Sequence, residues 1–155
     1  MPASPPTPPL PRPRAGRTDG RHTVPGARQS ERRCAASWGE IVRPDSYGHW
    51  REAGTDVDFF LEYDRGTEPL NRLVDKLDGY ADLRTATGVT TTWVLFWLPG
   101  YGREAALRKL LTSTPVPVAT AHANPGSTPA DAVWLSGKIS HVGRQRLAEL
   151  ASVGA

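Results

Sequence analysis

Two acidic residues interrupt an apolar segment of this 155-residue chain, and a third follows the segment directly. The segment Val57–Tyr63 is rich in β-branched and aromatic residues, which predicts a β-strand. Because side chains alternate along a strand, Asp58, Glu62 and Asp64 share one face, with Glu62 about 7 Å from Asp64. Two interpretations remain open. The face could hold a divalent cation, since Mg²⁺ prefers carboxylate oxygens, or it could be the solvated face of an antiparallel strand.

Two further residues could complete a cation site. Asp45, in the sequence Arg43-Pro44-Asp45, would place a carboxylate on the strand next to Glu62. Lys76 comes twelve residues after Asp64 and borders the apolar stripe of the next predicted helix. Its long side chain could reach the end of the acidic strand. The alternative for Lys76 is an ordinary surface lysine.

The elements that must position these residues follow from the apolar pattern. We expect strands at 32–38, 41–50, 57–63, 91–98, 116–121 and 133–135, and helices at 67–85, 104–111 and 144–153. Thr67 is the expected N-cap of the first helix, Gly88 can end it, and the polar segment 51–56 predicts a hairpin turn. The second helix should direct inward Ala105, Leu107, Leu110 and Leu111. This order predicts an α/β (α+β) fold, a mixed β-sheet with flanking helices.

The first 28 residues differ in composition from the rest. They hold eight of the fifteen prolines and five arginines against one acidic residue, which predicts a disordered Pro/Arg-rich leader. The net charge of +3 originates there, because residues 29–155 keep 19 − 5 = 14 basic and 16 − 1 = 15 acidic residues. The basic balance is therefore weak evidence for a nucleic-acid face. Residues 29–155 are expected to form a single α/β domain.

Two classes of protein are excluded by simple counts. The longest apolar run, Trp93–Leu98, is far shorter than the roughly 20 residues that a transmembrane helix needs. The single cysteine, Cys34, excludes an internal disulfide and a thiolate metal cage. We expect a cytoplasmic protein without a membrane partner.

Several motifs resemble known proteins. Pro44-Asp45 and Glu62-x-Asp64 are similar to the PD-(D/E)XK nuclease-like pattern, in which a hairpin presents an Asp and a Glu to Mg²⁺ and a lysine orients the attacking water. Asp64 stands where that lysine usually follows the Glu, and Lys76 in the next helix would replace it. From residue 29 to the end, the chain resembles the C-terminal half of the actinobacterial replication-relaxation family in the segments Ser30–Trp38, Arg43–Asp45, Val57–Leu70, Lys76–Tyr80 and Val94–Pro99.

The resemblance implies a protein of plasmid or mobile-element replication that binds or processes DNA, with plasmid replication or mobilisation proteins as partners. It implies Mg²⁺ held by Asp45, Glu62 and Asp64, and catalytic roles for these residues and Lys76 in phosphodiester hydrolysis. Asp64 would be a second ligand or the partner of Lys76. Neither the winged-helix region with which family members begin nor the first helix of the nuclease-like core is visible in the sequence. The alternatives are a non-catalytic regulatory or scaffold domain, or a truncated fragment without autonomous activity.

Overall fold

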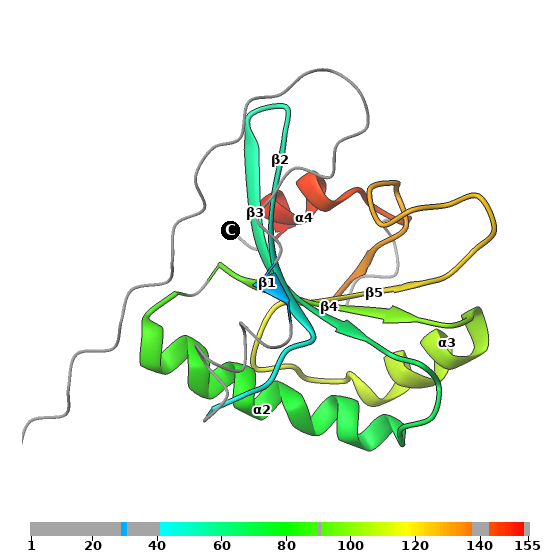
Figure 1. Ribbon diagram of the computed structural model, residues 1–155, viewed down its shortest axis with the longest axis horizontal. Helices are drawn as coiled ribbons and strands as arrows, with labels where there is room; N and C mark the ends of the chain where they lie inside the picture. Colours follow the sequence, from blue (N-terminus) through cyan, green and yellow to red (C-terminus); the bar gives the residue numbers. More distant parts are fainter. Residues whose placement is uncertain (1–28, 31–40, 90, 138–142, 154–155) are drawn as a thin grey trace, which may run out of the picture.

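A mixed β-sheet organises the residues that the computed structural model describes, which are 29–30, 41–89, 91–137 and 143–153 (Figure 1). Its strands lie in chain order as β1 (Gln29–Ser30), β2 (Ser46–Glu52), β3 (Thr55–Tyr63), β4 (Trp93–Leu98), β5 (Val118–His122) and β6 (Leu135–Ser136). The central strands β3, β4 and β5 are parallel, and the remaining pairs are antiparallel. The predicted fold class is confirmed. The strand predicted at 32–38 and the leader predicted at 1–28 lie outside the described residues.

The β2–β3 hairpin turns more tightly than the sequence predicts. Ala53 and Gly54 both have positive φ, 50° and 80°, which is the conformation of a two-residue turn with the twist of the flanking strands. The strands therefore continue through most of the segment 51–56 that was expected to be a turn. At its other end, β2 begins at Ser46 rather than at residue 41, because Pro44 has no N–H to donate to a ladder.

The helix α2 (Leu70–Thr87) connects β3 to β4 and lies against the sheet (Figure 1). Its predicted stripe is confirmed, since Leu73, Leu77 and Tyr80 are buried. Gly88 ends it in the left-handed conformation, as expected. The predicted N-cap at Thr67 is wrong. The helix starts after Pro69, which disfavours helical backbone at the residue before it and so prevents an earlier start.

The other two helices differ from the prediction in their bounds. The helix α3 (Tyr101–Leu110) begins three residues early. Leu107 is buried as expected, but Glu104 is buried as well and Leu110 is exposed, contrary to expectation. The helix α4 (Leu147–Val153) begins three residues late, because Gln145 still pairs with Trp134 through two backbone hydrogen bonds. Within the described part of the chain, no helix has the length and apolar character needed to cross a membrane.

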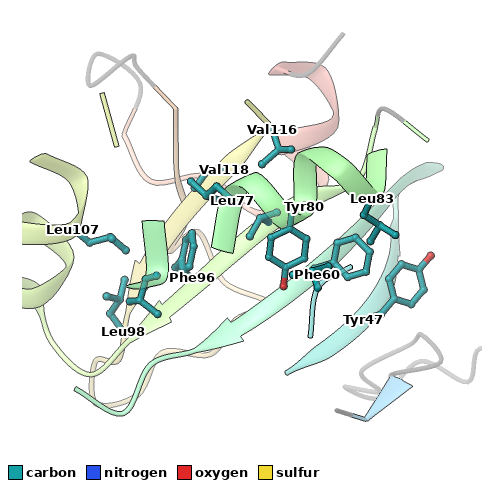
Figure 2. Packing of buried hydrophobic residues seen from close by; sticks show 13 residues of the cluster. Tyr47, Phe60, Leu77, Tyr80, Leu83, Phe96, Leu98, Leu107, Val116 and Val118 are labelled. Carbon is teal, nitrogen blue, oxygen red and sulfur yellow. The ribbon is translucent and has the colours of Figure 1, made fainter. Parts of the chain in front are cut away.

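Two apolar clusters hold the layers together, one on each face of the sheet. The cluster under α2 and α3 includes Phe60, Tyr80 and Leu107, with the rings of Phe60 and Tyr80 5.1 Å apart (Figure 2). The cluster under α4 includes Trp93 and Trp134. Trp97 packs on this second face with its ring 5.8 Å from Trp134, so both Trp93 and Trp97 contribute to the core.

Candidate functional site

The parallel strands β3, β4 and β5 end together at Tyr63, Leu98 and His122, and we call this end of the sheet the carboxyl edge (Figure 1). Ligand sites of open α/β sheets lie outside the carboxyl ends of their strands. The helices α2 and α3 both begin at this edge, because each follows the end of a parallel strand. Any side chain at the start of either helix is therefore close to the strand ends.

Glu62 is the buried centre of the predicted acidic group. It lies on the α2 side of β3 and is only 1% exposed. Its Oε2 accepts a hydrogen bond from Lys76 Nζ at 2.7 Å, and its Oε1 accepts one from the Tyr80 hydroxyl. Burial raises the pKa of Glu62, and the hydrogen bonds from Lys76 and Tyr80 oppose this shift only in part. A carboxylate kept ionised at such a site needs a cation beside it.

Lys76 supplies that cation from the second turn of α2. The expectation that it faces the acidic strand is confirmed by its contact with Glu62. Burial alone would lower the pKa of Lys76, but the hydrogen bond and charge of Glu62, together with the charge of Asp45, raise it above its usual value. The side chain is 30% exposed, so the ammonium group is paired on its protein side and open to water on the other.

Asp45 lies across the hairpin from Glu62. Ser46 pairs with Leu61, so one further step along the antiparallel strands sets Asp45 opposite Glu62. The carboxylate of Asp45 accepts the Tyr63 backbone N–H through Oδ2 at 2.7 Å. Its charge adds to the rise in the pKa of Glu62. The predicted grouping of Asp45 with Glu62 is therefore present, and we call Asp45, Glu62 and Lys76 the acidic site.

Asp64 pairs with an arginine that no motif in the sequence indicates. Arg103, from the first turn of α3, binds it in a bidentate pair, donating from Nε to Oδ2 and from Nη2 to Oδ1 at 3.0 Å. The Gly66 N–H also donates to Oδ1 at 2.9 Å. The partner of Asp64 is thus Arg103 rather than Lys76. Arg103 also binds the Glu68 carbonyl, so it ties the loop after β3 to α3.

Asp58 shares the face of Glu62 but belongs to a different network, near the hairpin turn. It accepts hydrogen bonds from the Tyr47 hydroxyl at 2.9 Å and from His49 Nδ1 at 2.7 Å. The other ring nitrogen of His49 lies 3.1 Å from Asp56. These contacts satisfy the carboxylate locally. The alternation of side chains along β3 correctly predicted that Asp58 and Glu62 share a face. Asp58 lies four residues before Glu62 on the strand, however, and is not part of the acidic site.

A second buried polar group, not anticipated from the sequence, lies at the end of β5. Glu104 is 1% exposed and accepts hydrogen bonds from Thr120 at 2.7 Å, His122 Nδ1 at 2.5 Å and Arg144 at 2.7 Å. Burial would raise the pKa of Glu104, but the hydrogen bonds from Arg144, His122 and Thr120 together lower it. We call these four residues the Glu104 cluster. Arg144 is 40 residues from Glu104 along the chain, so no local spacing could reveal the pair.

The acidic site offers two carboxylates to a cation. Among the described residues, no group of three or more His, Cys, Asp or Glu side chains has the arrangement of a metal site. Mg²⁺, however, is usually held by one or two carboxylates together with waters and substrate phosphates. Asp45 and Glu62 fit that requirement, and each keeps lone pairs beyond its protein hydrogen bonds. Asp64 fits it less well, because its Oδ1 already accepts two donors and Arg103 neutralises its charge.

Comparison with known proteins gives a family for the chain. Residues 13–93, just over half of the 155 residues, match the family model described as replication-relaxation. The matched range begins within the predicted leader, ends at the start of β4 and includes all four predicted site residues, while Arg103 and the Glu104 cluster fall beyond it. None of the curated proteins compared with the sequence matches it. The chain belongs to the replication-relaxation family, which indicates a role related to replication.

Proposed function

We propose that this protein processes DNA during replication or mobilisation of a plasmid or mobile element, by Mg²⁺-dependent hydrolysis of a phosphodiester bond. The observation that carries the proposal is the 2.7 Å contact between Lys76 and buried Glu62, with Asp45 on the neighbouring strand. A lysine held against one of two carboxylates at the carboxyl edge has the chemistry of a nuclease centre. The acidic hairpin and the helix that follows it also resemble the PD-(D/E)XK nuclease-like arrangement.

Each residue of the acidic site has a separate task in this proposal. Asp45 and Glu62 would hold the cation, which when bound polarises the phosphate and lowers the pKa of a water molecule. Lys76 keeps its proton because Glu62 and Asp45 raise its pKa, so it is suited to orient a water and to neutralise charge on the phosphate. Asp64 and Arg103 support the site by fixing the loop between β3 and α2.

The proposal also defines the partners and the place of action. The substrate is DNA, and the proteins that replicate or mobilise the same plasmid are the expected partners. Such a substrate requires a cytoplasmic location. The proposal also includes an actinobacterial origin, because the sequence resembles the actinobacterial members of the family.

Nicking of supercoiled plasmid tests the proposal directly. The full chain should convert supercoiled plasmid to the open circular form in Mg²⁺ or Mn²⁺, and a chelator should stop the reaction. Lys76→Ala should slow cleavage about 100-fold or more, the usual cost of losing one electrostatic group in an active site. Lys109→Ala is the matched control, because Lys109 is an exposed lysine on α3. This variant should cleave plasmid at the wild-type rate. Cleavage that survives Lys76→Ala would reject the role of Lys76.

A non-catalytic regulatory or scaffold role is the second candidate. It is favoured by the closed environment of Glu62, where Lys76 and Tyr80 already satisfy both oxygens from within the protein. In that case Lys76 stabilises a buried charge and nothing more. The wild type would then leave plasmid intact in either metal, and Lys76→Ala would lower only the melting temperature.

A further inference from the structure

Tyr101 is the most exposed of the large apolar side chains in the described part of the chain, at 70%. It is the first residue of α3 and so lies at the carboxyl edge, two residues before Arg103. Tyr63, the last residue of β3, is 56% exposed at the same edge. These two are the only exposed aromatic side chains among the described residues. Both residues therefore lie at the carboxyl edge, whereas Leu110 ends α3 and Val153 ends α4.

The Tyr101 ring contacts a buried side chain on one side, although most of the ring faces water. It stands edge-on to the imidazole of His122, with ring centroids 5.8 Å apart and an interplanar angle of 78°. His122 in turn donates to the buried carboxylate of Glu104 through Nδ1. A chain of contacts thus runs from the protein interior to an exposed aromatic face. An aromatic ring that is fixed before binding loses little rotational freedom when a ligand covers it.

We propose that Tyr101, assisted by Tyr63, stacks on unpaired bases of a single-stranded DNA segment bound along the carboxyl edge. This inference rests on the proposed function, because it names the form of DNA that the acidic site would receive. Aromatic side chains bind single strands by stacking on bases, whose faces in a duplex are covered by their neighbours. Arg65, two residues after Tyr63, is exposed, forms no ion pair with any described residue, and can contact phosphate.

This arrangement also gives the Glu104 cluster a purpose. Burying an ionised carboxylate is costly, and Glu104 is compensated by the hydrogen bonds that it accepts within the cluster. Here the buried carboxylate fixes His122, and His122 positions Tyr101. Tyr101 is the residue that touches the strand, and His122 and Glu104 are positioning residues.

Fluorescence anisotropy with a labelled oligonucleotide tests this proposal without requiring cleavage. The full chain is titrated into single-stranded and duplex forms of one sequence, in a chelator that prevents hydrolysis. Tyr101→Ala should weaken binding of the single strand by about 5- to 150-fold, the usual cost of losing one stacked base. Tyr101→Phe keeps the ring and should retain affinity. Leu110→Ala removes an exposed side chain from the far end of the same helix and is the matched control.

The salt dependence separates stacking from a charge effect. Tyr101→Ala should lower affinity at every salt concentration without changing the slope of log affinity against log salt. Arg65→Ala should reduce that slope by about 0.7, as expected for one lost phosphate contact on a single strand.

Three results would overturn the proposal: no binding of single-stranded DNA by the wild type, unchanged affinity in Tyr101→Ala, or an equal loss on duplex. An unchanged affinity would leave the tyrosines free to contact a protein. Single-strand binding that depends on Tyr101, in a protein that cleaves no plasmid, would support this inference and reject the nuclease.

Discussion

Two buried glutamates at the carboxyl edge have pKa values shifted in opposite directions. Glu62 and Glu104 are each 1% exposed, so burial disfavours the charged form of both. Glu62 has one partly exposed lysine and one hydroxyl as donors, and its pKa is raised. Glu104 has three donors, including the guanidinium of Arg144, and its pKa is lowered. The number and charge of the hydrogen-bond donors therefore decide the direction in which the pKa of each buried glutamate shifts.

The stability of the protein should therefore respond to pH in opposite ways at these two residues. Folded Glu62 binds its proton more tightly than the unfolded chain does. The wild type should thus lose stability relative to Glu62→Gln as pH rises from about 4.3, the ordinary pKa of Glu, toward the raised folded value. Folded Glu104 binds its proton less tightly. The advantage of the wild type over Glu104→Gln should be present above the ordinary pKa and disappear as pH falls through the lowered folded value.

Urea unfolding of the wild type and both variants across the acid range measures these differences. At each pH, the free energy of unfolding of a variant is subtracted from that of the wild type. The difference removes the contributions of the titrating groups that the substitution leaves unchanged. If the two differences in free energy change with pH in the same direction, the pKa values of Glu62 and Glu104 are not shifted in opposite directions.

At the level of elements, most local structure follows from the sequence, while the partners of buried charges do not. Alternation placed Asp58 and Glu62 on one face of β3, and the leucine stripe oriented α2 so that Lys76 borders the sheet. The start of α2 was misplaced because the effect of Pro69 on the preceding residue outweighed the capping preference of Thr67. Arg103 could not be assigned to Asp64, since the two are 39 residues apart and meet only when α3 packs at the carboxyl edge.

The β2–β3 hairpin depends on a glycine that faces an aromatic ring. Gly48 pairs with Phe59, and a Cβ built on Gly48 would lie 2.4 Å from the Phe59 ring. Gly48→Ala should therefore lower the free energy of unfolding by about 1–3 kcal/mol, the cost of overpacking. Adding Phe59→Leu should recover part of that loss, because the smaller side chain makes room for the new methyl group.

Gly102→Ala is the control for this prediction. A Cβ on Gly102 meets no atom within 4 Å, and alanine favours the α3 helix. Chemical denaturation of the four proteins gives the comparison. A Gly48→Ala protein as stable as the wild type would show that Phe59 does not cover Gly48 in solution.

At the scale of the whole molecule, the sheet brings three sets of charged side chains to one edge. The acidic site lies at the end of β3, the Asp64–Arg103 pair links β3 to α3, and the Glu104 cluster closes the end of β5. The sequence predicted the first set because Asp45, Glu62 and Lys76 come from consecutive elements. The Glu104 cluster could not be predicted without the tertiary structure, because Arg144 follows β6 in the chain and lies 40 residues from Glu104. Of these three sets, we expect only the acidic site to bind the cation.

Plasmid cleavage by two aspartate variants is the most direct test of that claim. Asp45→Asn removes a carboxylate from the acidic site, while Asp58→Asn makes the same change on the same hairpin within the separate His49 network. We expect Asp45→Asn to slow Mg²⁺-dependent nicking by about 100-fold or more, and Asp58→Asn to cleave at the wild-type rate. Equal rates for Asp45→Asn and the wild type, or a loss confined to Asp58→Asn, would contradict the assignment of the acidic site.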